Sequence, residues 1–376
     1  MKLTIIKNKL KRGLFIIERA CSKSLTLPIL NNVLFEKEKN FLNLCATDLE
    51  IGIKWWGLAK TEKEGKTLLP VRPVSNYISF LPEKPILIEK ENSFIKFECE
   101  NYKTKFKSLD PEEFPIIPKV SEEEFVSIPG FIFSKSLKKV VDFTLPSTTR
   151  PEISGVYIIF SKNFIKLVAT DSFRLGEKTH TLTKPTKLEK EYAVIVPQRA
   201  VKEIINIFGE IEKEIKIYLS TNQISLESEM EEIPHPEILL TSRLIEGEFP
   251  DYEAIVPKKF ETEITLFKEE FLRQIKMASI FSGKSNEIRL KINPEKDEIE
   301  FLSENLELGS YKSLMKGKIK GKNLNIAFNH KFLAEGVSQI EGKELVFQLT
   351  DEEGPAILKP FENQNFFYVL MPIKAT

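Results

Sequence analysis

The sequence has few of the residues that indicate a secreted or membrane-spanning protein. Its 376 residues include only three cysteines, Cys21, Cys45 and Cys99, and these lie far apart. An odd number of scattered cysteines argues against a disulfide framework and fits the reducing cytoplasm. No apolar run approaches the roughly 18 residues that a spanning helix needs. The first residues, 1–6, have the pattern of a strand and lack the apolar core of a signal peptide. We therefore expect a cytoplasmic protein without membrane contact.

Residues for metal or nucleotide chemistry are also scarce. The three histidines, His180, His235 and His330, have no metal-ligand spacing and no cysteine nearby, so we expect no metal site. Two segments, 65–67 and 283–285, resemble the end of a phosphate-binding loop but lack its leading glycine. No cluster of carboxylates recurs at a plausible spacing. The sequence therefore predicts no catalytic site and no cofactor.

What the sequence does have is enough apolar residues and enough length for several folded cores. Hydrophobic residues make up 41% of the chain and charged residues 29%, which is typical of folded domains and not of disordered chains. A single core rarely grows beyond about 250–300 residues. We therefore expect two to three domains.

An internal repeat favours three. The segment Cys45–Gly52 resembles Val168–Gly176, and Leu302–Gly309 is a weaker third copy. Each copy follows a strand-like run of alternating residues. Proline-rich segments, 114–118 and 249–257, follow the first and second copies and predict crossovers between domains, because proline is not tolerated in a central strand. We predict domains at 1–122, 123–256 and 257–376.

Each predicted domain contains two amphipathic helices. Apolar residues spaced i, i+3, i+4, i+7 lie on one helical face, and six segments have this spacing. They are residues 7–23, 71–82, 134–143, 198–208, 267–284 and 329–340. Short strands are expected immediately before three of them, at 3–6, 131–133 and 264–267.

Positive charge is concentrated on these six segments, although the whole chain has no net charge. Together they carry eleven more Lys and Arg than Asp and Glu, so the rest of the chain carries the opposite excess. Basic helical surfaces can neutralise DNA phosphates. No recognition helix or zinc-finger spacing indicates that bases are read. The alternative is that the charged faces are only solvated.

Several motifs resemble those of the bacterial replicative sliding clamps, the beta subunits of DNA polymerase III. They are Thr26–Asn32, Ala46–Glu50, Ala169–Asp171 with Arg174–Leu175, Gly247–Tyr252 and Tyr368–Lys374. The resemblance implies an α+β fold of three repeated DNA-clamp domains, each with two inner helices packed on antiparallel sheets, and a ring-forming, head-to-tail homodimer. It also implies a non-catalytic processivity factor that encircles double-stranded DNA, slides without sequence specificity and tethers the polymerase.

The resemblance further implies three sets of functional residues. The polymerase catalytic subunit, the clamp loader and other replication and repair proteins would insert short peptides into a pocket between the second and third domains. Its residues would be Ile153, Thr170, Ser172, Phe173, Arg174, Leu175, Pro250, Ile255, Val369, Leu370, Met371 and Pro372. DNA contacts are expected at Lys7, Lys11, Arg12, Lys23, Arg72, Lys135, Lys138, Arg150, Arg199, Lys202, Arg273 and Lys276. At the dimer interface, Phe106 would pack against Ile280 and Phe281 of a second copy.

Two other functions compete with this interpretation. A protein that grips duplex DNA without encircling it would bind short linear fragments as well as circles. An enzyme of nucleic-acid metabolism would need a carboxylate or metal cluster. Asp48 and Asp171 are candidate carboxylates, but each follows a threonine at the end of a predicted strand. A Thr-Asp pair in that position more often orders a turn through side-chain to backbone hydrogen bonds.

Overall fold

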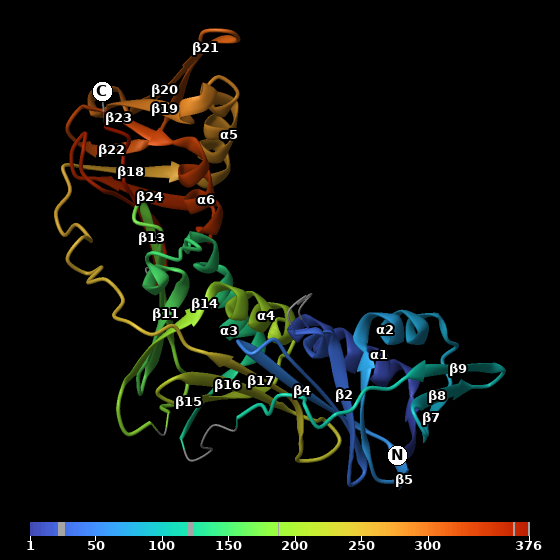
Figure 1. Ribbon diagram of the computed structural model, residues 1–376. Helices are drawn as coiled ribbons and strands as arrows, with labels where there is room; N and C mark the ends of the chain where they lie inside the picture. The colour runs from blue at the N-terminus through green and yellow to red at the C-terminus, as the bar shows by residue number, and fades with distance from the viewer. Residues whose placement is uncertain (22–26, 119–123, 187, 364, 375–376) are drawn as a thin grey trace. The chain divides into compact units, whose positions relative to one another are not determined.

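The computed structural model describes residues 1–21, 27–118, 124–186, 188–363 and 365–374 (Figure 1). The chain forms two compact units. Unit 1 contains Met1–Ser134, Pro185–Tyr192 and Arg199–Leu244, and unit 2 contains Lys135–Lys184, Ala193–Gln198 and Ile245–Thr376. All three cysteines are free thiols. Within the described ranges, no helix is long and apolar enough to cross a membrane.

The described residues form six α-helices, five of them where the periodicity predicts them. They are α1 (Lys7–Ile17), α2 (Val71–Phe80), α3 (Gly130–Lys138), α4 (Gln198–Phe208), α5 (Lys268–Ser279) and α6 (His330–Gln339). Their inward residues are those that the apolar spacing selects: Leu10, Leu14 and Ile17 of α1 are fully buried. The same spacing buries Phe271 and Ile275 of α5.

The predicted bounds of the third helix and of the strand before it were wrong. We expected a strand at 131–133 and a helix at 134–143, whereas the strand β10 is Phe125–Pro129 and α3 begins at Gly130. Phe131 and Phe133 have the two-residue spacing of a strand, but only Phe133 is buried, and it packs inward with Leu137 one turn later. The packing of the helix against the core therefore determined the structure of this segment, and the alternating phenylalanines did not indicate a strand.

Unit 1 contains two sheets. The five-stranded sheet has the order β5 (Lys60–Lys63), β1 (Lys2–Ile6), β7 (Pro85–Glu91), β8 (Phe94–Cys99), β9 (Tyr102–Lys107). The eight-stranded sheet has the order β10, β15 (Glu214–Leu219), β16 (Gln223–Glu229), β17 (Pro236–Arg243), β4 (Ile51–Leu58), β3 (Phe41–Thr47), β2 (Asn32–Glu38), β6 (Lys66–Pro70). Neighbouring strands run antiparallel, as in β1–β7 and β3–β4.

Unit 2 contains the other two sheets. The nine-stranded sheet has the order β14 (Tyr192–Pro197), β11 (Gly155–Phe160), β12 (Phe164–Thr170), β13 (Arg174–Thr181), β26 (Phe366–Leu370), β25 (Ala356–Pro360), β24 (Glu344–Leu349), β18 (Thr262–Phe267), β22 (Lys318–Gly321). The four-stranded sheet has the order β21 (Gly309–Lys316), β20 (Glu298–Asn305), β19 (Glu287–Asn293), β23 (Leu324–Asn329).

The strand orders confirm a three-fold repeat. One four-stranded order occurs as β1-β7-β8-β9, β10-β15-β16-β17 and β18-β24-β25-β26, and a second as β4-β3-β2-β6, β13-β12-β11-β14 and β21-β20-β19-β23. In each large sheet the second order of one repeat joins the first order of the next, through the pairs β4–β17 and β13–β26. The sheets thus continue across the repeats, which is why the compact units do not coincide with them. The exact domain boundaries stay predictions.

The adjacent tryptophans of β4 pack into different clusters, Trp55 against α1 and Trp56 with residues of both the first and the second repeat. Trp55 is 2% exposed and lies against α1, where a Cβ added to Gly13 would be 2.4 Å from its ring. Only glycine lets the helix approach so closely. Trp56 packs with Phe41, and its indole N–H donates to Glu38 Oε2 at 2.9 Å.

Candidate functional site

The turn between β12 and β13 is built by a Thr-Asp pair. The Thr170 hydroxyl donates to the Arg174 carbonyl at 2.7 Å, and Asp171 Oδ1 accepts from the backbone N–H groups of Phe173 and Arg174 at 3.0 and 3.1 Å. Ser172 has a φ of 77°, in the left-handed region. These bonds hold Ser172 and Phe173 outward at the tip of the turn, where both are exposed.

The turn between β3 and β4 has the same construction. The Thr47 hydroxyl donates to the Ile51 carbonyl, Asp48 Oδ1 accepts from two backbone N–H groups, and Leu49 has a φ of 78°. The prediction that the Thr-Asp pairs order turns is therefore confirmed. The shared bonds make Ile51 the counterpart of Arg174, and Gly52 that of Leu175.

Arg174 is held by its own neighbours. Its guanidinium forms ion pairs with Asp171, at 2.9 Å, and with Glu335 of α6, and it lies 4.3 Å from the ring centroid of Phe332 and 5.3 Å from that of Phe143. The side chain is only 9% exposed. Arg174 therefore joins β13 to α6, and its use as a polar anchor for a peptide stays a prediction.

The twelve residues expected to form the pocket all lie in unit 2 and separate by burial. The buried ones are Ile153, Thr170, Leu175, Val369 and Leu370, and the exposed ones are Ser172, Phe173, Ile255 and Met371. Pro250 and Pro372 are half-buried, and Arg174 is intermediate as a whole residue although its side chain is only 9% exposed. Phe173 and Met371 are neighbours, because the backbone N–H of Met371 donates to the carbonyl of Phe173 at 2.9 Å. That the twelve residues form one pocket stays a prediction.

The linker that supplies Pro250 and Ile255 is fixed to the nine-stranded sheet by two aromatic side chains. The Phe249 ring stacks on Tyr157 of β11 with centroids 4.7 Å apart. Tyr252 is 5% exposed and packs in a cluster that includes Leu175 and Val369. Sequence reasoning assigned no role to Tyr252, although it ends the Gly247–Tyr252 motif.

Two polar contacts accompany this packing. The Tyr252 hydroxyl donates to Glu177 Oε2 of β13 at 2.8 Å, and Oε1 of the adjacent Glu253 is a more distant acceptor at 3.4 Å. Burial raises the pKa of the Glu177 carboxyl, although Tyr252 and Lys166 favour its charged form. Burial, assisted by Glu177, also raises the pKa of the tyrosine hydroxyl, so Tyr252 stays a donor. Glu177 has no signal in the sequence, because its partner is 75 residues away.

The first repeat provides an internal comparison, because β4–β17 corresponds to β13–β26. The backbone N–H of Arg243 donates to the Glu50 carbonyl at 2.9 Å, as Met371 does to Phe173. In β17 and the residue after it, Thr241, Ser242 and Arg243 occupy the positions that correspond to Val369, Leu370 and Met371, in that order. Ile117 also covers Gly52, because a Cβ added to that glycine would be 2.7 Å from Ile117 Cδ1. The corresponding position in unit 1 is therefore more polar and covered.

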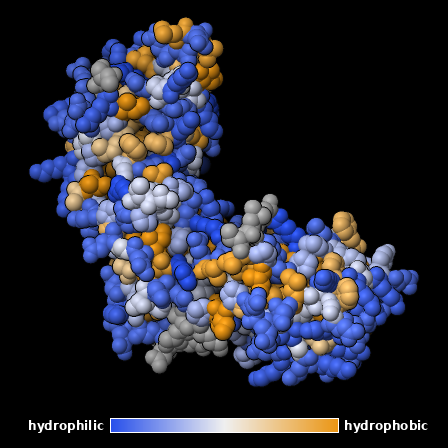
Figure 2. Space-filling view, in the orientation of Figure 1, coloured by the Kyte–Doolittle hydropathy of each residue, from blue (hydrophilic) through white to orange (hydrophobic). Residues whose placement is uncertain are grey.

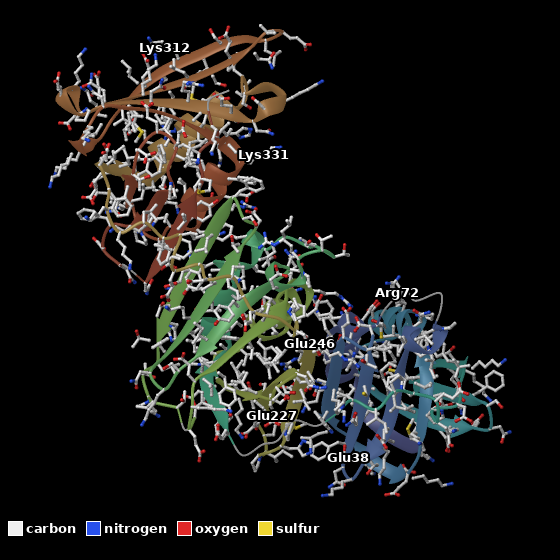
Figure 3. All side chains as sticks on the ribbon, turned by 60° about the vertical axis from the view of Figure 1, so that its left-hand side comes forward. Glu38, Arg72, Glu227, Glu246, Lys312 and Lys331 are labelled. Carbon is white, nitrogen blue, oxygen red and sulfur yellow. The ribbon has the colours of Figure 1, made fainter. Side chains whose placement is uncertain are left out.

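Most of the residues expected to contact DNA are exposed on their helices. The exposed ones are Lys11, Arg12, Arg72, Lys135, Lys138, Arg150, Arg199, Lys202, Arg273 and Lys276. Figure 3 shows Arg72 of α2 on the helix side of unit 1, with Glu38 and Glu227 on the strand side. Within the described part of the chain, Lys11, Lys138, Lys202, Arg273 and Lys276 form no ion pair.

Two members of the set differ from this pattern. Lys7 is only 4% exposed and its ammonium pairs with Glu83 at 2.6 Å, so its charge is neutralised and turned away from the helix surface. This corrects the expectation for Lys7, which arose because helical periodicity alone does not place the first residue of a helix. Lys23 lies outside the described residues.

Each of the four sheets ends in two strands that have a neighbour on one side only among the described strands. Two of these end strands are β9 in unit 1 and β21 in unit 2. Phe106 of β9 lies edge-on to Tyr77 and Phe97, 5.9 and 5.7 Å away between centroids. Near β21, Ile280 is 63% exposed and Phe281 stacks on Tyr311. Figure 2 shows hydrophobic surface in this area, over α5 and the β20–β21 end.

Comparisons with known proteins agree along the whole chain. Models of the N-terminal, central and C-terminal domains of the DNA polymerase III beta subunit match residues 1–118, 131–251 and 253–374. The beta sliding clamps of Synechocystis sp. and Bacillus subtilis are each 25% identical and cover 100% of this chain, and it covers 99% and 100% of them.

Solved structures show the same fold. The DNA polymerase sliding clamp from Bacillus subtilis has a TM-score of 0.94 at 24% identity, with 100% of both chains covered. The DNA polymerase III beta subunit from Thermotoga maritima has a TM-score of 0.90 at 23% identity, again with 100% of both chains covered.

Proposed function

The chain belongs to the DNA polymerase III beta subunit family, and from that premise we propose that two copies close head to tail into a ring around double-stranded DNA. In this role the chain is a non-catalytic processivity subunit of the replication machinery in the cytoplasm. A ring that encircles DNA keeps a bound polymerase near its template by raising its effective concentration, without new chemistry. The observation that carries this proposal is the pair of open edges on β9 and β21.

The other repeats show which strands these two edges would pair with. The strands β17 and β26, which correspond to β9, pair with β4 and β13, which correspond to β21. Two of the three equivalent junctions are thus formed within the chain. The two strands of the third, β9 and β21, belong to the first and the last repeat and are not paired with each other. Unpaired strand edges are a hazard that proteins normally cover. A second copy that offers β21 to β9, and β9 to β21, covers all four edges.

The internal junctions also supply the expected register. Thr104 corresponds to Leu240 and Tyr368, because each ends a strand ladder that starts four residues before the first helix of its repeat, at Leu3, Val126 and Ile264. Tyr311 corresponds to Ile53 and Gly176 by its pairing with β20. Since Leu240 pairs with Ile53 and Tyr368 with Gly176, we expect Thr104 of one copy opposite Tyr311 of the other. This register brings Phe106 into the same interface as Phe281, which stacks on Tyr311.

Cysteine cross-linking tests the interface and its register. The next pair in this register is Lys105 with Ser310, and neither residue is in the core. Oxidation of a Lys105→Cys, Ser310→Cys variant should give covalent dimers. Pairing Lys105→Cys with Lys312→Cys, two residues along the same strand, is the matched control and should cross-link poorly. The native Cys45 thiol should contribute little, because it is buried and burial raises its pKa to about 12. A monomeric protein, or equal cross-linking of both pairs, contradicts the proposal.

Binding to DNA should depend on topology. The exposed basic residues of the helices can make diffuse contacts with phosphates, which suit sliding because they do not select a sequence. The protein should stay on a nicked circle at a salt concentration that removes it from linear DNA, and cutting the circle should release it. Equal retention on both forms favours a protein that grips DNA without encircling it.

Partner peptides should bind in unit 2, where Phe173, Ile255 and Met371 are exposed beside a buried apolar floor. Such a surface fits a short peptide with leucine and aromatic side chains. A Phe173→Ala, Met371→Ala variant should lose most of its affinity for such a peptide and stay dimeric. Arg243→Ala, at the corresponding position of the first repeat, is the control and should bind normally. Unchanged binding by the double variant contradicts the placement of the pocket.

A further inference from the structure

We propose that the hydrogen bond between Tyr252 and Glu177 positions one wall of the partner-peptide pocket and thereby sets its affinity. This inference rests on the proposed function of that pocket. It assigns to Tyr252 and Glu177 a positioning role, because they act through Pro250 and Ile255 and not by touching the peptide.

The first argument is the place of Tyr252 in the linker. It lies between the two linker residues of the pocket, two positions after Pro250 and three before Ile255. The backbone N–H of Ile255 donates to the carbonyl of Tyr252 at 3.1 Å, so the turn that presents Ile255 starts at the anchored residue. Ile255 itself is 56% exposed, which leaves its position to be fixed by this turn and not by burial.

The second argument is the environment of the side chain. The Tyr252 ring packs with Leu175 and Val369, which are the floor of the same pocket. Apolar packing fixes the depth of a ring but is tolerant of sliding, whereas a hydrogen bond is directional. Glu177 is only 13% exposed, and Lys166 lies 4.0 Å from its carboxylate and 3.3 Å from that of Glu253. The acceptor is therefore held in one place, and the hydroxyl defines where the linker crosses β13.

The third argument is the contrast with the first linker. There Phe114 and Ile117 pack against Cys45 and Leu68 in an apolar cluster. The residue of β4 that corresponds to Glu177 is Lys54, two positions after Gly52 as Glu177 is two after Leu175. The polar anchor thus occurs at the junction where the pocket is open and is replaced by apolar packing where Ile117 covers Gly52.

Tyr252→Phe tests the inference, because it removes the hydroxyl and keeps the ring. Glu177→Gln is the conservative variant, since its amide oxygen still accepts a hydrogen bond, and Glu177→Leu removes the acceptor. Tyr192→Phe is the matched control, because its hydroxyl donates to Glu124 at 3.1 Å in the other unit. The probe is a fluorescein-labelled peptide that contains glutamine, two leucines and phenylalanine. Its dissociation constant is measured with the dimeric protein, together with amide hydrogen exchange at Ile255.

Tyr252→Phe and Glu177→Leu should weaken peptide binding by about five- to tenfold, the effect of one net hydrogen bond. Both should speed exchange at Ile255, whereas Glu177→Gln should restore binding to within about twofold. The control should change neither readout, and the dimer mass should stay the same throughout. If the hydrogen bond had a purely structural role, Tyr252→Phe and Glu177→Leu would lower thermal stability but leave the affinity for the peptide unchanged.

Two results distinguish a failure of this inference from a failure of the proposed peptide pocket. Normal affinity and normal exchange at Ile255 in Tyr252→Phe overturn the inference and leave the pocket in place. Absence of peptide binding by the wild-type protein overturns the pocket, and with it the affinity part of the inference. In that case faster exchange at Ile255 in Tyr252→Phe still supports the positioning of the linker.

Discussion

Replacing Arg174 by alanine should destabilise unit 2 far more than its position beside a surface pocket suggests. The substitution leaves the carboxylate of Asp171, which is 9% exposed, without its cation. Removing one partner of a buried ion pair costs about 3–5 kcal/mol. The second pair, to Glu335, adds only about 0.2–1 kcal/mol, because that carboxylate is 49% exposed. The stacking on Phe332 adds about 0.5–2 kcal/mol.

The sum predicts a loss of about 4–8 kcal/mol in the free energy of unfolding of unit 2. For a domain of 150–250 residues this corresponds to a Tm lower by roughly 8–32 °C. Differential scanning calorimetry of the dimer measures it directly. Arg150→Ala is the matched control, because Arg150 pairs with Glu152 at 3.2 Å but its side chain is 49% exposed. The control should lower Tm by no more than about 4 °C.

The Tm values of Arg174→Ala and Arg150→Ala together test whether Arg174 stabilises the fold. A Tm for Arg174→Ala within about 2 °C of wild type would mean that the guanidinium does not stabilise the fold, and that it is available to a partner. The predicted loss, in contrast, means that Arg174→Ala is a poor probe of peptide binding. Weak binding by that variant would then report damage to the joint between β13 and α6. Met371→Ala is the cleaner probe, because Met371 is 39% exposed and has no charged partner to lose.

Three further predictions concern other parts of the molecule. Glu177→Gln should become more stable relative to wild type as pH rises above about 4.5, measured by Tm, because the raised pKa of Glu177 means that its ionisation destabilises the folded state. A difference independent of pH contradicts this. Phe106→Ala with Ile280→Ala should give monomers in light scattering, since apolar anchors carry much of an interface's energy, and a dimer mass would refute the assignment. Gly336→Ala should lower the free energy of unfolding by about 1–3 kcal/mol, because its Cβ would be 2.3 Å from the Tyr368 ring, and an unchanged midpoint in urea denaturation would contradict that.

Local sequence patterns were sufficient for most of the secondary structure. The spacing of Leu10, Leu14 and Ile17 predicts α1 because a helix repeats every 3.6 residues whatever it packs against. The Thr-Asp turns were predictable for the same reason, because their hydrogen bonds reach only two to four residues along the chain. The one displaced helix, α3, shows the limit of such patterns, since Phe131 and Phe133 fit a strand as well as a helix until Leu137 is known to share the core.

Similar patterns led to most of the candidate site, but not to its working parts. The motifs around Thr170 and Val369 predict the floor and edge of the proposed pocket. They do not reveal Glu177, because its partner Tyr252 is remote in sequence. Nor do they reveal that Lys7 is buried against Glu83, which lies 76 residues away.

The sequence by itself determined three repeats, six helices, the turns and the excess of positive charge on the helices, because each depends on neighbours within a few residues. Only the tertiary structure decided which sheet edges are joined and which are open. It alone shows that β17 pairs with β4 and β26 with β13, while β9 and β21 each have a partner on one side only among the described strands. Strand pairing joins residues that are far apart in sequence, and their hydrogen bonds come from backbone groups that every residue carries. No side-chain pattern records that choice.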